Sequence, residues 1–153
     1  MTDLALQTAL DLAQSIRKQD ISPLELTEYF LDRIARQDQI LGSFCHVAPE
    51  TAIATAKAQT EQLSQTRDLS TLPPFFGVPI GIKDLNTVVG MPVSYGVAAL
   101  KDHIADRDDG VVTKLKQAGF VILGKTTTSQ IGTFPYTEPP GFLPSRNPWH
   151  LDH

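Results

Sequence analysis

Hydrophobic side chains in the first half of the chain recur every three or four residues, as they do on one face of an α-helix. This spacing predicts helices over residues 3–18, 23–38 and 49–62, with a short strand at residues 43–47 between the last two. Together they form a mainly helical lead-in over residues 1–68. The face that the first helix is expected to bury consists of Leu6, Ala9, Leu10, Ala13 and Ile16.

Beyond this lead-in, the pattern over residues 75–133 changes to that of a strand, a helix and a second strand. A linker at residues 69–76 leads to an apolar strand at residues 78–82, and a helix is predicted at residues 109–118. The apolar run at residues 120–123 is typical of a strand that is buried on both faces. Two strands joined through a helix predict a parallel pair.

Two helix ends are marked by their residues. Ser22 can cap the second helix, Pro23 suits its first helical position, and Glu25 can bond back to the cap. Gly119 is suited to end the helix at residues 109–118, because glycine adopts the left-handed conformation without steric cost.

The last segment, residues 134–153, has five prolines and no regular periodicity, yet it carries Phe142 and Trp149. We interpret it as a loop that lies against a protein surface that this chain need not contain. The three segments are expected to belong to one domain, because 153 residues make a chain of single-domain size.

Composition and charge exclude several classes of function. Hydrophobic residues at 41% and charged residues at 20% are near the values of globular chains. A net charge of −4 argues against nucleic acid as a partner, since that partner needs clustered Lys and Arg. The prolines at 73, 74 and 79 break the longest uncharged stretch, so we expect no membrane span. A single cysteine and the lack of a signal-like N-terminus favour the cytoplasm.

The segment from Gly119 to Thr126 matches the phosphate-loop pattern G-x-x-x-x-G-K-[ST]. A phosphate loop needs a strand before it and a helix that opens at its lysine. Here a helix comes first, and the four variable positions are themselves a predicted strand, so the backbone amides would be used in the sheet. Nucleotide binding at residues 119–126 is therefore kept only as a third hypothesis.

The cysteine and the histidines do not predict a metal or a nucleophile. Cys45 and His46 are adjacent, so on a strand their side chains should point to opposite faces. His150 and His153 have a ligand-like spacing, but no further Cys or His lies nearby in the sequence to complete a closed site. We expect neither a metal nor a cofactor.

Lys83 follows the apolar strand at residues 78–82, at the end where open α/β sheets bind their ligands. Gly81 lies on the same strand face and would leave space beside the amine. If the amine were desolvated there, it could act as a base near neutrality. The alternative is an ordinary lysine whose stem runs along the protein surface to water.

Four segments, in order, resemble motifs of the amidase signature family of serine hydrolases. They are the helix start at residues 22–34, the G-V-P-x-x-x-K-D stretch within residues 76–84, the stretch at residues 106–126, and R-N-P-W at residues 146–149. The resemblance implies an α/β fold with a mixed, partly parallel sheet covered by helices. Residues 1–153 would form the N-terminal part of a single amidase domain.

The resemblance also implies a Ser, cis-Ser, Lys triad that hydrolyses a small-molecule amide and releases ammonia or an amine. Lys83 occupies the lysine position, and the two serines are expected just after residue 153. Residues 127–130 depart from the pattern of the tRNA-dependent amidotransferase subunit, which favours a general amidase. Residues 1–153 alone are then predicted to be inactive and to self-associate through an uncovered sheet edge. The runner-up is a non-catalytic binding protein derived from an amidase.

Overall fold

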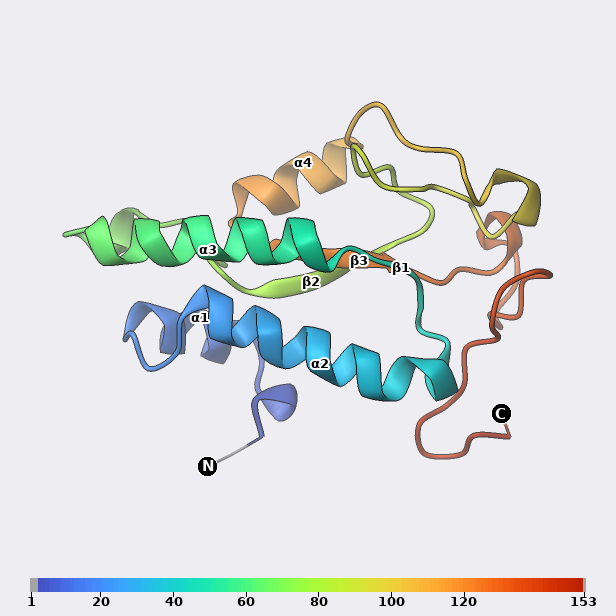
Figure 1. Cartoon of the computed structure of the whole chain (residues 1–153), viewed down its shortest axis with the longest axis horizontal. Helices are drawn as coiled ribbons and strands as arrows, with labels where there is room; N and C mark the ends of the chain where they lie inside the picture. The colour runs from blue at the N-terminus through green and yellow to red at the C-terminus, as the bar shows by residue number, and fades with distance from the viewer. Residues whose placement is uncertain (1–2, 153) are drawn as a thin grey trace.

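A small sheet lies between helices in the computed structural model, which describes residues 3–152 (Figure 1). The helices and strands are α1 (Ala9–Arg17), α2 (Pro23–Leu41), β1 (Phe44–Val47), α3 (Pro49–Gln65), β2 (Pro79–Lys83), α4 (Gly110–Gln117) and β3 (Val121–Thr126). Short 3-10 helices occur at Leu4–Leu6, Leu69–Thr71, Ala98–Leu100 and Gln130–Gly132. None of the helices described is both long enough and apolar enough to cross a bilayer.

The sheet is mixed, as the family resemblance implies, and it contains the parallel pair that the strand–helix–strand pattern predicts. Its order is β1-β3-β2, with β2 parallel to β3 and β1 antiparallel to it. β3 lies in the centre and is buried from Val121 to Lys125. β1 and β2 are the two edges of the described sheet, and self-association through such an edge stays a prediction.

A bulge interrupts the pairing of the parallel strands. Ile80 is opposite Ile122, but the next pair is Gly81 with Gly124, so Leu123 is an extra residue on β3. Beyond the bulge, Ile82 is opposite Lys125 and Lys83 is opposite Thr126. Lys125 therefore shares the face of Ile82, whereas Lys83 shares the opposite face with Gly81.

The two faces of the sheet pack against different helices. Ala52 and Ala56 of α3 are fully buried against Val121 and Leu123, in a cluster that also includes Phe30 of α2. On the other face, a cluster joins Val112 of α4 to β2 and β3; its buried members are Ala48, Ile82, Val88, Met91, Val112 and Ile122. Figure 1 accordingly shows α2 and α4 on opposite sides of the strands.

The prediction of a first helix over residues 3–18 is wrong in two respects. Thr8 forms a capping box with Asp11, so the chain breaks before α1. The buried face of α1 consists of Leu12, Ala13 and Ile16, whereas Leu6 and Leu10 are 77% and 69% exposed. The cap sets the later start of the helix, while Ala13 and Ile16 of the predicted face are buried as expected and Leu12 takes the place of Leu10 in the core.

The other expected elements are found, with small changes in length. Ser22 and Glu25 form the predicted capping box of α2, which runs three residues further than expected. The segment at residues 69–76 is not a solvated linker, because Phe76 is buried and the Arg17 guanidinium donates hydrogen bonds to the carbonyls of residues 72–74 at 2.6–3.3 Å.

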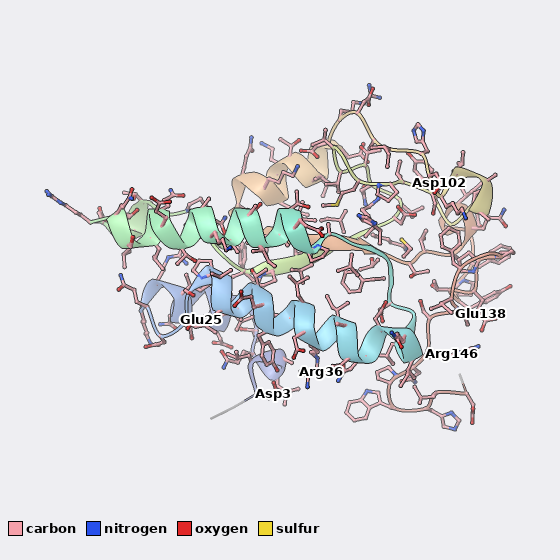
Figure 2. The ribbon with its side chains drawn as sticks, viewed as in Figure 1. Asp3, Glu25, Arg36, Asp102, Glu138 and Arg146 are labelled. Carbon is pink, nitrogen blue, oxygen red and sulfur yellow. The ribbon has the colours of Figure 1, made fainter. Side chains whose placement is uncertain are left out.

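The C-terminal segment forms no helix or strand within the part described, residues 134–152, as expected. It returns to the end of α2, where the Arg146 backbone amide donates to the Leu41 carbonyl at 2.8 Å and the Arg146 side chain pairs with Glu138 at 2.7 Å (Figure 2). Trp149 is nevertheless 94% exposed. The segment is therefore attached to the domain but leaves its largest aromatic side chain uncovered.

Gly119 ends α4 in the left-handed conformation that the sequence predicts, at φ +97°. Its amide donates to the Lys116 carbonyl at 3.0 Å, and the Phe120 amide donates to the Leu115 carbonyl at 3.3 Å. A Cβ at this position would lie 2.7 Å from Cα of Phe76. Both the backbone conformation and the available space therefore require glycine.

We expect Gly119→Ala to lower the free energy of unfolding of residues 1–153 by at least about 1–2 kcal/mol, because alanine is strained in this conformation. Urea unfolding at low micromolar protein concentration measures the change. Gly110→Ala is the matched control, since a Cβ there meets nothing within 4 Å and alanine favours the helix. Equal destabilisation by both variants would contradict the assignment.

Candidate functional site

Lys83 is the last residue of β2, and its side chain is exposed. Of the two alternatives for Lys83, the exposed side chain matches the lysine whose stem runs to water, and the described residues do not desolvate the amine. The physical reason is that β2 is an edge strand of the described sheet, so no further strand covers the lysine on that side. The expected position, at the carboxyl end of a strand of a parallel pair, is nevertheless the one observed.

Gly81 lies on the same strand face as Lys83, but its missing side chain does not leave free space. A Cβ at Gly81 would lie 2.7 Å from Cγ2 of Thr126 and 3.2 Å from Cζ of Phe44. The glycine thus lets these two side chains pack closely on the strand. An open groove of about 300 Å³ begins beside it and runs along α2, where Arg33 and Asp38 supply its charged lining.

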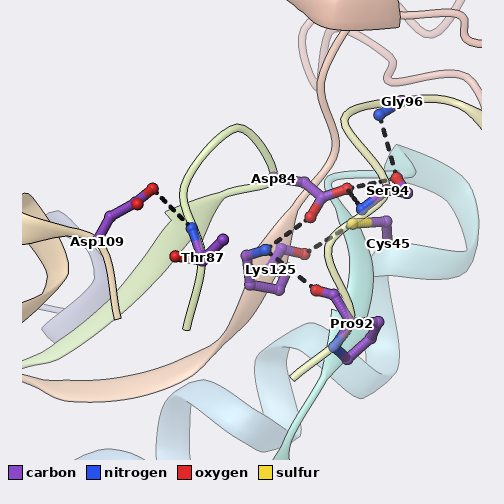
Figure 3. Close-up of polar contacts among 8 residues, drawn as sticks. All are labelled: Cys45, Asp84, Thr87, Pro92, Ser94, Gly96, Asp109 and Lys125. Atoms are coloured by element: carbon purple, nitrogen blue, oxygen red, sulfur yellow. Dashed lines mark hydrogen bonds and ion pairs between the residues drawn. The ribbon is translucent and has the colours of Figure 1, made fainter. Parts of the chain in front are cut away.

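The main polar feature of this end of the sheet is a buried ion pair between Asp84 and Lys125 (Figure 3). Nζ of Lys125 lies 2.6 Å from Oδ1 of Asp84 and also donates to the Pro92 carbonyl at 3.1 Å. Oδ2 of Asp84 accepts from both the backbone amide and the hydroxyl of Ser94. The side chains of Lys125 and Asp84 are 0% and 3% exposed, so each charge depends on the other for compensation.

Further hydrogen bonds tie the long loop between β2 and α4 to the domain. The Gly96 amide donates to the Ser94 hydroxyl at 3.1 Å. Asp109 directly precedes α4, but its carboxylate accepts from the Thr87 amide at 2.9 Å and does not cap the helix. The loop is thus held at Ser94 by the ion pair and at Thr87 by Asp109.

The structure of residues 119–126 differs from that of a phosphate loop, as the sequence predicts. The stretch from Val121 to Thr126 is the central strand, and the helix α4 precedes it. Lys125 is fully buried and paired with Asp84, so its ammonium is not available to a phosphate group.

Cys45 and His46 were expected on opposite faces of β1, but both line one cavity of about 350 Å³. A register shift between Phe44 and His46 breaks the simple alternation of the strand. The Cys45 thiol donates to the Lys125 carbonyl at 3.4 Å, and burial, followed by the nearby Asp84 carboxylate, raises the pKa of this thiol to about 12. Burial, together with the Lys125 ammonium, lowers the pKa of His46. Cys45 is therefore a neutral thiol near neutrality and a poor nucleophile.

Among residues 3–152 there is no group of three or more His, Cys, Asp or Glu side chains that could hold a metal ion. His153, whose spacing from His150 is ligand-like, lies outside the described residues.

Asp84 and Ser94 are site residues for which the sequence predicts no role of their own. The available signal for Asp84 was its place beside Lys83 in the K-D step of the motif. Ser94 had no comparable signal, because its contact with Asp84 depends on the path of the loop.

Comparisons with known proteins agree on one family. The sequence model of the family described as Amidase matches residues 25–153. A putative amidase of Synechocystis is 63% identical over 100% of this chain, which covers 30% of that protein. A glutamyl-tRNA(Gln) amidotransferase subunit from Nocardia farcinica is 39% identical, with coverages of 97% and 30%. The chain thus spans about 30% of the length of these curated relatives.

Comparison with solved structures also finds amidases. A bacterial aryl acylamidase of the amidase signature family superposes with a TM-score of 0.88 at 28% identity, over 95% of this chain and 30% of that chain. A peptide amidase superposes with a TM-score of 0.84 at 27% identity, with coverages of 97% and 31%.

We expect Lys125→Met to lower the free energy of unfolding of residues 1–153 by about 3–5 kcal/mol, because it leaves the buried Asp84 carboxylate unpaired. Lys116→Met is the matched control: it breaks the surface pair with Asp108, and such pairs contribute about 1 kcal/mol or less. Urea unfolding compares the two variants. A loss for Lys125→Met no larger than that of the control would show that the pair is not structurally important.

We also expect ATP with magnesium to give no saturable heat of binding in calorimetry and no rise in melting temperature. The reason is that the backbone amides of β3 are used in the sheet and Lys125 is buried. A micromolar affinity that Lys125→Ala abolishes would overturn this interpretation.

Proposed function

Because the chain belongs to the amidase family, we propose that it forms the lysine-bearing part of an amide hydrolase of the Ser, cis-Ser, Lys type, with Lys83 as the base. The two serines would come from the part of the relatives that this chain does not span. The observation that carries the proposal is the position of Lys83, which ends a strand of a parallel pair within the G-V-P-x-x-x-K-D motif.

The exposure of Lys83 is consistent with this role. A base must reach the group from which it takes a proton, and the side chain of Lys125 on the neighbouring strand cannot do so, because it is buried and ion-paired. In the complete enzyme, the segment that carries the serines would cover the open side of β2 and exclude water from the amine. Desolvation would then favour the neutral form of the amine, which is the form that accepts a proton.

The proposed reaction follows from general-base activation of a weak nucleophile. The neutral amine of Lys83 takes a proton through the bridging serine while the oxygen of the nucleophilic serine attacks the carbonyl carbon of the amide. The carbon–nitrogen bond then breaks, and the proton passes to the departing nitrogen. Water hydrolyses the resulting ester, so the products are a carboxylic acid and ammonia or an amine.

The substrate that we propose is a small-molecule amide rather than a tRNA-linked one. Residues 127–130 depart from the pattern of the amidotransferase subunit, and the relative at 63% identity is a putative amidase. The cytoplasm remains the expected location.

A second candidate function is that of a non-catalytic binding protein. The exposed apolar side chains of the C-terminal segment favour it, since such residues mark surfaces that bind another protein. The most exposed of them are Phe134, Tyr136, Leu143 and Trp149. The same surface would also be explained if the rest of an amidase domain covers it.

The proposed function can be tested in a complete enzyme in which residues 1–153 replace the matching part of the Synechocystis relative. We expect this enzyme to hydrolyse simple carboxamides, and Lys83→Ala to lower kcat/KM about 10²–10⁴-fold through loss of the base. Lys83→Arg should be equally impaired, because a guanidinium keeps its proton at any working pH. Release of ammonia measures the activity, and residues 1–153 alone should show none.

Lys57→Ala is the control for this experiment, since Lys57 is an exposed lysine of α3 and should not affect the rate. Hydrolysis by residues 1–153 alone, or full activity of the complete enzyme with Lys83→Arg, would show that another residue is the base. If the complete enzyme and all its variants are inactive although folded, the binding function is favoured instead.

A further inference from the structure

We propose that the buried ion pair of Asp84 and Lys125, with its hydrogen bonds to Ser94, fixes the position of the Lys83 amine. This inference rests on the proposed function, because it concerns the residue assigned there as the base. Asp84 directly follows Lys83 in the chain, and its carboxylate lies on the opposite face of the sheet from the amine. The pair therefore acts on Lys83 through the backbone, from the opposite face of the sheet. It does not contact a substrate bound on the face where the amine lies.

The backbone around Lys83 is fixed on both sides. The Asp84 amide donates to the Thr126 carbonyl at 3.0 Å, which continues the pairing of β2 with β3 past Lys83. The Asn86 amide donates to the Lys83 carbonyl at 3.0 Å, which closes a turn immediately after the strand. Lys83 is thus held at the junction of a strand and a turn, although its side chain is free at the surface.

The hydrogen bonds of the Asp84 carboxylate restrict the backbone conformation at this junction of strand and turn. Its two oxygens accept hydrogen bonds from Lys125 on the central strand and from Ser94 in the loop that follows β2. A rotation of the backbone at Lys83 would pull the carboxylate away from these donors. The side chains of Asp84 and Lys125 are almost fully buried, so a rotation that broke these hydrogen bonds would leave a charge poorly compensated.

The pair also removes a charge that would oppose the role of Lys83. A lone carboxylate beside the base would stabilise its protonated form, whereas the base must be neutral at rest. Lys125 cancels that charge. Two cavities bring further ionisable groups to this region. Arg33 and Asp38 of α2 line the groove beside Gly81, and Cys45, His46, Lys101 and Asp102 line the cavity to which Asp84 and Ser94 also belong.

The sharpest test uses the pH profile of kcat/KM in the complete enzyme described above, because its acid limb reports the ionisation of the base. Lys125→Met leaves the Asp84 charge and should move the acid limb to higher pH by roughly half a unit. Asp84→Asn leaves the Lys125 charge and should move it to lower pH. The double variant Asp84→Asn with Lys125→Met should return the limb toward that of the parent.

Each single variant should also lower kcat by about 10–100-fold, with KM within about twofold, because a small misplacement of a catalytic group slows the chemical step. The matched control is Lys116→Met, which breaks the surface ion pair on α4 and should change neither kcat nor the pH profile. A purely structural role for the pair would reduce the amount of folded enzyme but would not move the acid limb in opposite directions.

Ser94→Ala keeps both charges and removes one hydrogen-bond donor to Asp84. It therefore tests the positioning role even if the other variants do not fold. We expect it to lower kcat by roughly tenfold, with the acid limb unmoved. Unchanged acid limbs in both single variants, or an unchanged kcat in Ser94→Ala, would overturn the positioning role even where Lys83→Ala inactivates the enzyme. Full activity of Lys83→Ala would instead overturn the proposed function.

Discussion

The ion pair between Asp84 and Lys125 is the interaction on which the polar end of this sheet depends. It places a fully buried ammonium group near the end of the central strand, and only a carboxylate at hydrogen-bond distance makes that burial tolerable. The same carboxylate holds Ser94, and through it the long loop that covers one face of the sheet. The central strand β3, the end of the edge strand β2 and the loop that follows it are therefore all connected through this one ion pair.

The two lysines near the carboxyl ends of β2 and β3 show how environment separates residues of identical chemistry. Both lie at the carboxyl ends of parallel strands, yet Lys83 is exposed and Lys125 is buried. The difference follows from the face on which each side chain lies. On one face the Lys83 amine is exposed, and on the other the Lys125 amine is buried against Asp84 and Pro92 of the segment that follows β2.

Apart from the parallel pairing of β2 with β3, the features that the sequence predicts correctly are those decided by near neighbours in the chain. The capping box of Ser22 and Glu25 and the left-handed end at Gly119 each depend on a few adjacent residues. The buried face of α1 was predicted only in part, with Ala13 and Ile16 buried but Leu10 exposed, because it depends on where the helix meets the core. The pairing of Asp84 with Lys125 joins residues 41 positions apart and depends on strand register, so periodicity could not reveal it. The exposure of Lys83 depends on which strands flank β2, which local sequence does not specify.

The bulge at Leu123 has a consequence for how this sheet could change in evolution or design. In an uninterrupted ladder that continued the pairing of Ile80 with Ile122, Lys83 would be opposite Lys125, and two ammonium groups would lie side by side. The bulge prevents this, although leucine itself brings no reactive group. The requirement is one of pairing geometry, because Leu123 must stay outside the ladder. If the bulge were straightened without loss of a residue, the inside and the outside of β3 would be exchanged for every position that follows, whereas deletion of Leu123 would keep Lys83 opposite Thr126.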